Sequence, residues 1–149
     1  MARADECVIL RSGVGATKYI FRPGQLELAT APRYEVNEIV GVAESGAVKI
    51  ARISTARQIF YEFRVKQLKF ADDTTATAGM TYRGFSSLEN FINSVADFRY
   101  NAVQLKVAGA ADSDGNYVSV RYWDSTIPVS QDPDCPDSYS GKLVFRKEV

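Results

Sequence analysis

The segment "IFYEFRVKQLKF", residues 59–70, restricts the fold of this chain more than any other stretch. Ile59, Tyr61, Phe63 and Val65 alternate with mostly polar residues, so they share one face of an extended strand. The apolar positions then shift phase, because the next one is Leu68. Such a shift predicts a β-bulge, or a strand that crosses between two sheets.

Most other apolar stretches are short and rich in Val, Ile, Phe and Tyr, which is typical of strands. The predicted strands are residues 7–10, 17–22, 25–28, 34–42, 47–53, 103–107, 117–123 and 142–147. Residues 44–46 are predicted to form a hairpin turn, because Gly46 tolerates a positive φ. We expect one domain over residues 1–149, mainly β in the α+β class: a β-sandwich or partly closed β-barrel with one amphipathic helix.

Residues 86–98, "SSLENFINSVADF", form the one long segment with helical periodicity. Ser86 and Glu89 match a capping box, in which each side chain would satisfy a backbone N–H at the start of the helix. The apolar residues recur at helical spacing and predict one buried stripe. These predicted core residues are Leu88, Phe91, Ile92, Val95 and Phe98.

The absence of histidine limits the chemistry more than any motif does. The 149 residues contain no His, which excludes Ser-His-Asp, Cys-His and His-metal mechanisms. The 18 basic and 18 acidic residues balance, and this balance argues against nucleic acid or an anionic membrane as the main partner. We expect no enzymatic activity, no catalytic residues and no cofactor.

Neither a secretory signal nor a transmembrane stretch is evident. The first six residues are mostly charged or small, and no apolar run approaches the roughly 18 to 20 residues that a spanning helix needs. Cys7 and Cys135 are the only cysteines, and we expect two free thiols in a protein that folds in a cytoplasm.

Two acidic stretches resemble metal loops but fit turns better. In residues 112–116, "DSDGN", Gly115 comes two positions too early for an EF-hand loop, and no acidic residue stands at the twelfth position. Asp-Gly between two alternating segments instead predicts a hairpin. Residues 131–141, "QDPDCPDSYSG", contain three Asp and a Cys, but their prolines predict an irregular loop. We expect no metal site.

Aromatic residues gather near the C-terminus. Because neighbouring strand residues point to opposite faces, Tyr122 and Trp123 cannot both be buried under one sheet. At least one of them is therefore a candidate interface residue, as is Tyr139 in the following loop.

The order of these segments resembles the tail-tube-like fold of bacteriophage tail proteins. The second half is similar to the distal tail and minor tail proteins of long, non-contractile tails. The resemblance covers residues 57–149, and it depends on "RQIFYEFRVKQLKF", "GFSSLENFINSVADFRYNAVQLKV", "YVSVRYWDSTIPVS" and "YSGKLVFRKEV". Some of these proteins carry an added C-terminal sugar-binding domain, which we do not expect in this chain.

The resemblance implies a structural virion protein that forms a homo-oligomeric ring, commonly a hexamer. The ring would join the tail tube to the baseplate or receptor-binding proteins of the tail tip. DNA would only pass through its lumen, no membrane would be involved, and assembly would take place in the cytoplasm of the host bacterium. Residues 72–84 and 125–140 are candidate contact loops; the first supplies the candidate interface residues Asp72, Thr75, Met80 and Tyr82.

Two other non-enzymatic functions fit the same sequence, and the one enzymatic alternative is a hydrolase that acts through paired carboxylates. A tail tube subunit would stack into long polymers, whereas a tip protein would stop at one ring. A carbohydrate-binding β-sandwich module would use Trp123 and the neighbouring tyrosines.

Overall fold

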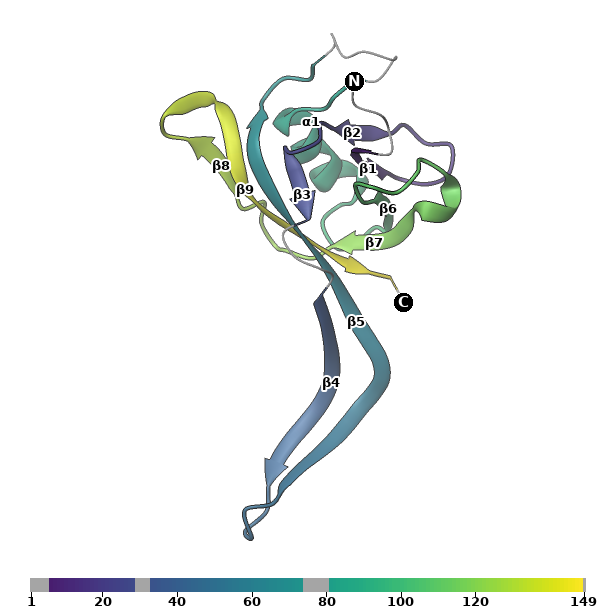
Figure 1. Cartoon of the computed structure of the whole chain (residues 1–149), viewed down its shortest axis with the longest axis vertical. Coiled ribbons are helices and arrows are strands. Elements are labelled where there is room, and N and C mark those ends of the chain that lie inside the picture. The colour runs from purple at the N-terminus through teal and green to yellow at the C-terminus, as the bar shows by residue number, and fades with distance from the viewer. Residues whose placement is uncertain (1–5, 29–32, 74–80, 149) are drawn as a thin grey trace.

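The computed structural model describes residues 6–28, 33–73 and 81–148, and for residues 33–41 and 49–57 it describes the backbone only. The chain is mainly β with one short helix, which confirms the predicted class. The strands are β1 (Val8–Arg11), β2 (Tyr19–Phe21), β3 (Leu26–Leu28), β4 (Arg33–Val42), β5 (Val48–Lys69), β6 (Val103–Lys106), β7 (Val118–Tyr122), β8 (Val129–Asp132) and β9 (Cys135–Lys147). They form one open sheet (Figure 1).

The main path of the sheet runs β2-β1-β6-β7-β9-β5-β3, while β4 pairs with β5 and β8 pairs with β9. All of these neighbouring strands are antiparallel. β2 and β3 stand at opposite ends of this path, yet only four residues, 22–25, separate them along the chain. The sheet must therefore curve so that its two ends approach each other.

The main core lies between the concave face of this sheet and the helical segment. Fully buried side chains come from every part of the path, including Phe21 on β2, Phe63 on β5, Leu105 on β6 and Phe145 on β9. Phe63 and Phe145 meet edge to face, with their ring centroids 6.0 Å apart. Apolar side chains from distant segments thus hold the curved sheet around one centre.

The predicted phase shift in residues 59–70 is a β-bulge. β5 pairs with β9 in regular register up to Val65, and the register shifts before Leu68. Gln67 lies between them with φ 50°, so it occupies the left-handed region that a non-glycine residue rarely adopts. The bulge lets both Val65 and Leu68 point into the core, where they are 1% and 0% exposed.

Helix α1 (Phe85–Asn90) continues into the π-helical turn η2 (Phe91–Val95). Leu88, Phe91 and Ile92 are fully buried in the core. Val95 and Phe98 are partly buried and pack against the same cluster. The stripe predicted from the sequence therefore faces the core, although the regular helix is shorter than the predicted residues 86–98.

The predicted capping box is wrong. The N-cap is Gly84, and no side chain within the helix caps it. The Ser86 hydroxyl instead donates to the carbonyl of Phe70, at the end of β5. A carboxylate outside the helix, that of Asp72, accepts from the Gly84 N–H at 2.8 Å.

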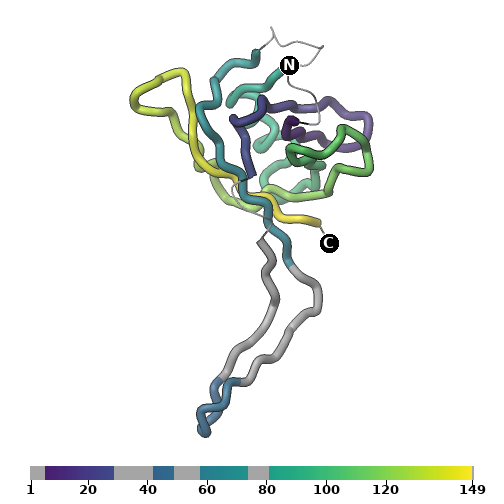
Figure 2. Tube along the Cα trace, in the orientation of Figure 1, coloured from purple at the N-terminus to yellow at the C-terminus, as the bar shows by residue number. Residues whose placement is uncertain are grey.

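The β4–β5 hairpin extends from the rest of the molecule, and its turn lies at the far end from α1 (Figures 1 and 2). The predicted turn at residues 44–46 is confirmed: the Gly46 N–H donates to the carbonyl of Ala43, and Gly46 has φ 85°. β5 is continuous from Val48 to Lys69, where the sequence predicted two separate strands.

Residues 131–141 were predicted as an irregular loop and residues 125–140 as a contact loop, and both predictions are wrong for the part that forms β8 and the start of β9. β8 pairs antiparallel with the start of β9, with Val129 opposite Gly141. Prolines interrupt the alternation that would reveal these strands. They are tolerated here because this hairpin lies at the margin of the sheet, off its main path.

The hairpin predicted around residues 112–116 is confirmed in its antiparallel strands but not in its tight Asp-Gly turn, because residues 107–117 connect the two strands. β6 and β7 pair antiparallel, and the chain between them contains the short 3-10 turn η3 (Asp114–Asn116).

Cys7 is buried, Cys135 is exposed, and both are free thiols. Within the described ranges, no helix has the length and apolar character to cross a bilayer.

Candidate functional site

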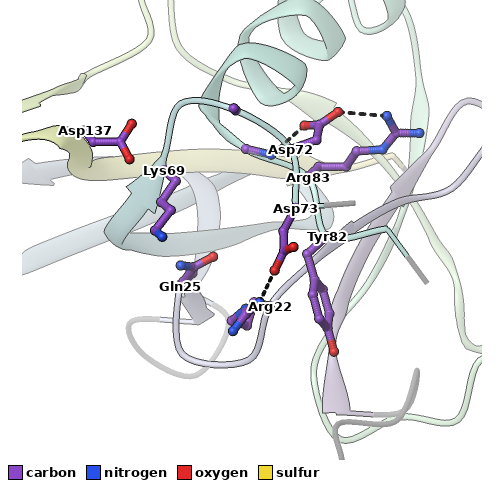
Figure 3. Close-up of a pocket in the computed structure, with 10 residues that line it drawn as sticks. Arg22, Gln25, Lys69, Asp72, Asp73, Tyr82, Arg83 and Asp137 are labelled. Carbon is purple, nitrogen blue, oxygen red and sulfur yellow. Dashed lines mark hydrogen bonds and ion pairs between the residues drawn. The ribbon is translucent and has the colours of Figure 1, made fainter. Parts of the chain in front are cut away.

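The predicted interface residues separate into a pocket, a groove and the core. Asp72 and Tyr82 line a pocket beyond the end of β5 (Figure 3). Trp123 lines a groove near the C-terminal end of β9. Thr75 and Met80 lie outside the described residues.

Two of the predicted interface residues are buried within the chain itself. Tyr122 is 0% exposed, packs against Phe145 and donates its hydroxyl to the carbonyl of Thr126 at 2.6 Å. The prediction that Tyr122 is an interface residue is therefore wrong, because β7 turns it inward and Trp123 outward. Tyr82 is 6% exposed, so its side chain also has little surface to offer a partner.

Tyr139 has a mixed position. Its ring stacks on Phe85 at a centroid distance of 4.5 Å and also contacts Phe70. It is partly buried against the core. Tyr139 thus packs against the first residue of α1 and the residue that follows β5, and only part of its surface is free.

The pocket beyond β5 has a volume of about 360 Å³. Four segments bring its lining together: the β2–β3 connection, the end of β5, the residues before α1, and the start of β9. Its charged side chains are three basic and three acidic: Arg22, Lys69, Arg83, Asp72, Asp73 and Asp137.

Two ion pairs cross this pocket, as the dashed lines in Figure 3 show. Arg22 pairs with Asp73, and its guanidinium carbon lies 4.9 Å from the centre of the Tyr82 ring. Arg83 pairs with Asp72 at 3.1 Å. Most of the charge in the pocket is therefore neutralised within the chain.

Asp72 is the most highly connected carboxylate of the pocket. It accepts from the Gly84 N–H, from the Ser87 hydroxyl at 2.7 Å and from Arg83. Burial raises the pKa of the Asp72 carboxyl, but these donors together outweigh burial and hold the pKa below its ordinary value. Asp72 is thus a carboxylate at neutral pH, and it anchors the start of α1 to the end of β5.

A backbone clamp holds the two chain segments that enter the pocket. The Asp73 N–H donates to the carbonyl of Tyr82 at 2.8 Å, and the Arg83 N–H donates to the carbonyl of Ile20 at 2.8 Å. Burial raises the pKa of the Tyr82 hydroxyl above its ordinary value. The clamp ties Asp73 to Tyr82 and ties Arg83 to β2.

The groove is built around Trp123 and has a volume of about 500 Å³. The guanidinium carbons of Arg99 and Arg146 lie 5.1 and 4.6 Å from the centre of its indole ring. Arg121 forms an ion pair with Glu148 at 2.7 Å and donates to the carbonyls of Arg99 and Tyr100. Lys147 completes the basic lining, so four basic side chains share one carboxylate.

Sequence reasoning identified Trp123 but missed the basic residues around it. Arg121 and Arg146 stand directly opposite each other on β7 and β9, and Arg99 follows the helical segment. The sequence does contain one signal. In "SVRYW" and "LVFRK" the apolar residues alternate with others, so Arg121, Trp123 and Arg146 are expected on the outward face of their strands. The register between the two strands, which the sequence does not give, brings these residues together.

Three acidic residues of the two stretches that resemble metal loops have partners within the chain. Asp112 accepts from the Tyr117 hydroxyl at 2.6 Å and pairs with Lys18, while Asp114 pairs with Arg11. Asp132 accepts from the Ser140 hydroxyl. In the part of the chain that the structure describes, no group of three or more His, Cys, Asp or Glu is placed to hold a metal ion.

Comparison with protein-family models finds no match to this chain. Comparison with curated proteins finds no match either.

Proposed function

We propose that this chain is a structural protein of a phage tail tip, of the distal-tail or minor-tail kind, and not an enzyme. It would form a ring that joins the tail tube to the baseplate or receptor-binding proteins. The observation that carries this proposal is the extended β4–β5 hairpin. The resemblance of residues 57–149 to such tail proteins supports it.

The hairpin is a two-stranded ribbon that contact with a neighbouring subunit would stabilise. β4 is 10 residues long and pairs, among the described strands, with β5 alone. An isolated two-stranded ribbon is at best marginally stable in water. Val42 and Val48, which flank its turn, are 70% and 62% exposed. Packing of the hairpin against the next subunit would cover these apolar residues and stabilise the ribbon.

The curvature of the sheet supports the finer fold that the resemblance implies. The approach of β2 and β3, at opposite ends of the strand order, is what a partly closed barrel requires. Subunits of this shape can stand side by side in a ring around a lumen. Balanced net charge suits a lumen through which DNA passes without binding.

The chemistry of the pocket favours a structural role. Asp72 is saturated with donors and Asp73 pairs with Arg22, so neither carboxylate is placed to transfer a proton at neutral pH. The Trp123 ring already carries two guanidinium groups, which leaves less of it for stacking on a sugar. Both observations support the structural proposal over a hydrolase or a sugar-binding module.

The test is the mass distribution of the purified protein, measured by light scattering with negative-stain imaging of the same fractions. We expect closed rings. Val42→Asp and Val48→Asp should abolish them while the subunit stays folded by circular dichroism, since both side chains are exposed. Val14→Asp is the matched control, because Val14 is 69% exposed in the β1–β2 connection, away from the hairpin.

Other outcomes decide against the proposal. Open-ended tubes would identify a tail tube subunit. Monomers at all concentrations, together with a change in Trp123 fluorescence on addition of glycans, would identify a binding module. Rings that persist in both hairpin variants would show that the hairpin is not a subunit contact.

A further inference from the structure

The groove around Trp123 carries positive charge that the described part of the chain does not neutralise. Arg121 and Arg146 are cross-strand partners, and like charges at such positions destabilise a sheet. Glu148 pairs with Arg121, but Arg99, Arg146 and Lys147 form no ion pair with any described residue. A groove of this kind is suited to an acidic partner that also contacts an aromatic ring.

The tip of the β8–β9 hairpin, formed by residues 132–137, has complementary charge. It contains Asp132, Asp134 and Asp137, and no basic residue occurs between positions 131 and 141. Asp134 and Asp137 are exposed and form no ion pair with any described residue. This acidic turn, residues 132–137, therefore presents carboxylates to solvent.

The acidic turn is also preorganised for binding. Pro133 and Pro136 restrict its backbone, and the Gln131 side chain donates to the carbonyl of Pro136 across it. The Ser140 hydroxyl donates to the Asp132 carboxylate at 3.0 Å, which joins the two strands next to the turn. Binding would cost little conformational entropy, because the turn is already closed in the free chain.

The groove and the acidic turn of one chain cannot meet. β9 is 13 residues long; Asp137 is its third residue, and Arg146 and Lys147 are its last two. At about 3.3 Å per residue, Asp137 and Arg146 are about 30 Å apart along the strand. Figure 1 shows the β8–β9 turn and the C-terminus on opposite sides of the body. A contact between them must join two chains.

We propose that the acidic turn of one subunit binds in the Trp123 groove of the next. This inference rests on the proposed ring and names a contact that closes it. Because two different surfaces meet, the contact is heterologous, and repetition of one such contact around an axis produces a ring. The carboxylates of Asp134 and Asp137 would pair with Arg99 and Arg146 of the neighbour.

Charge reversal tests the contact. The groove variant Arg99→Glu/Arg146→Glu and the turn variant Asp134→Lys/Asp137→Lys should each weaken self-association by about tenfold or more in light scattering. Lys142→Glu is the control for the groove, since it changes an exposed base on the same strand. Glu89→Lys is the control for the turn, since it changes an exposed acid on α1.

A mixture of the two variants gives the decisive result. The groove variant has an acidic groove and an acidic turn, and the turn variant has a basic groove and a basic turn. Two copies of the same variant therefore repel each other at the contact. A copy of one variant attracts a copy of the other, whichever of the two supplies the turn and whichever the groove. Equal amounts of the two should recover rings in which the variants alternate, and the single chain that carries all four substitutions should recover rings alone. Failure of both to recover assembly would overturn the proposal.

Cys135 allows the contact to be located directly. It is exposed in the acidic turn, whereas Cys7 is fully buried, so a thiol-reactive photo-crosslinker should label Cys135 alone. Intermolecular cross-links should map by mass spectrometry to peptides that contain Trp123 or Arg99. Cross-links elsewhere would overturn the inference.

The outcomes separate this inference from the proposed function. If the wild type and both charge-reversal variants form rings, and the cross-links map elsewhere, the proposed contact is overturned but the ring is not. Absence of both wild-type rings and cross-links would overturn both proposals. Rings that survive in the groove variant while binding of a single-stranded oligonucleotide is lost would identify the groove as a nucleic-acid site instead.

Discussion

The guanidinium carbon of Arg11 lies 3.6 Å from the centre of the Tyr117 ring. Arg11 is only 2% exposed, and its side chain also donates to Gln104 at 2.7 Å and to Asp114 at 2.9 Å. A cation buried to this extent needs each of these partners, because loss of hydration is costly. Arg11 thereby ties the β6–β7 loop to the outer face of β1.

Variants of Tyr117 should separate the two interactions of this ring. Tyr117→Phe removes the hydroxyl that donates to Asp112 but keeps the ring over Arg11. We expect it to lower the free energy of unfolding by about 1.5 kcal/mol. Tyr117→Leu also removes the cation–π contact and should cost about 3 kcal/mol in total. Chemical denaturation measures both; equal effects of the two variants would show that the ring does not stabilise Arg11.

The bulge at Gln67 gives a second prediction. Its backbone N–H donates to the Ser140 hydroxyl, and its φ of 50° is costly for any residue with a Cβ. Gln67→Gly should leave stability unchanged or raise it by up to about 1 kcal/mol. Gln67→Val should lower it by about 1 to 2 kcal/mol, because a β-branched residue fits the left-handed region poorly. A stabilising effect of valine in chemical denaturation would contradict the assigned bulge.

The bulge itself could be predicted because it leaves a local trace. The shift of apolar phase between Val65 and Leu68 lies within four residues of sequence, and strand alternation converts it directly into geometry. The buried stripe of the helical segment is visible for the same reason, since its spacing is local. Features of this kind are encoded within one element.

Features that depend on distant segments were missed. The capping box failed because the helix begins before Ser86, whose N–H and hydroxyl both donate to the carbonyl of Phe70, sixteen residues earlier. The groove around Trp123 depends on the register that places Arg121 opposite Arg146 across two strands. Such contacts follow from tertiary packing, which a single sequence does not reveal.

Gly141 is predicted to be indispensable to the β8–β9 hairpin. A Cβ at this position would lie 2.6 Å from the Cα of Val129 and would also overlap the carbonyl of Pro128. Gly141→Ala should therefore lower the free energy of unfolding by about 3 kcal/mol or more, through steric overlap in a paired strand. Gly13→Ala is the control, because a Cβ there meets nothing within 4 Å and the φ is ordinary.

The two variants differ by one methyl group each, so the comparison isolates the local space. Thermal unfolding followed by circular dichroism measures both. Gly13→Ala should be neutral or slightly stabilising, by up to about 1 kcal/mol. A Gly141→Ala protein as stable as its Gly13→Ala counterpart would contradict the close approach of β8 to β9.

Asp72 should make stability depend on acid pH. Because its pKa is lower in the folded chain than its ordinary value, the carboxylate stabilises the fold above the ordinary pKa of about 4. That contribution is lost as the pH falls through the lowered pKa, where the folded carboxylate also becomes protonated. Asp72→Asn removes the charge that attracts Arg83 and weakens the bonds from Gly84 and Ser87.

We therefore expect Asp72→Asn to cost about 1 to 2 kcal/mol at pH 7 and progressively less between about pH 5 and pH 2. Urea denaturation across this range measures the difference between parent and variant. The control is Glu89→Gln, which removes an exposed carboxylate on α1 that forms no ion pair with any described residue and should leave the free energy of unfolding unchanged at pH 7. A difference for Asp72→Asn that stays constant down to pH 2 would show that the Asp72 charge does not stabilise the fold. The cost at pH 7 would then arise from altered packing at the start of α1.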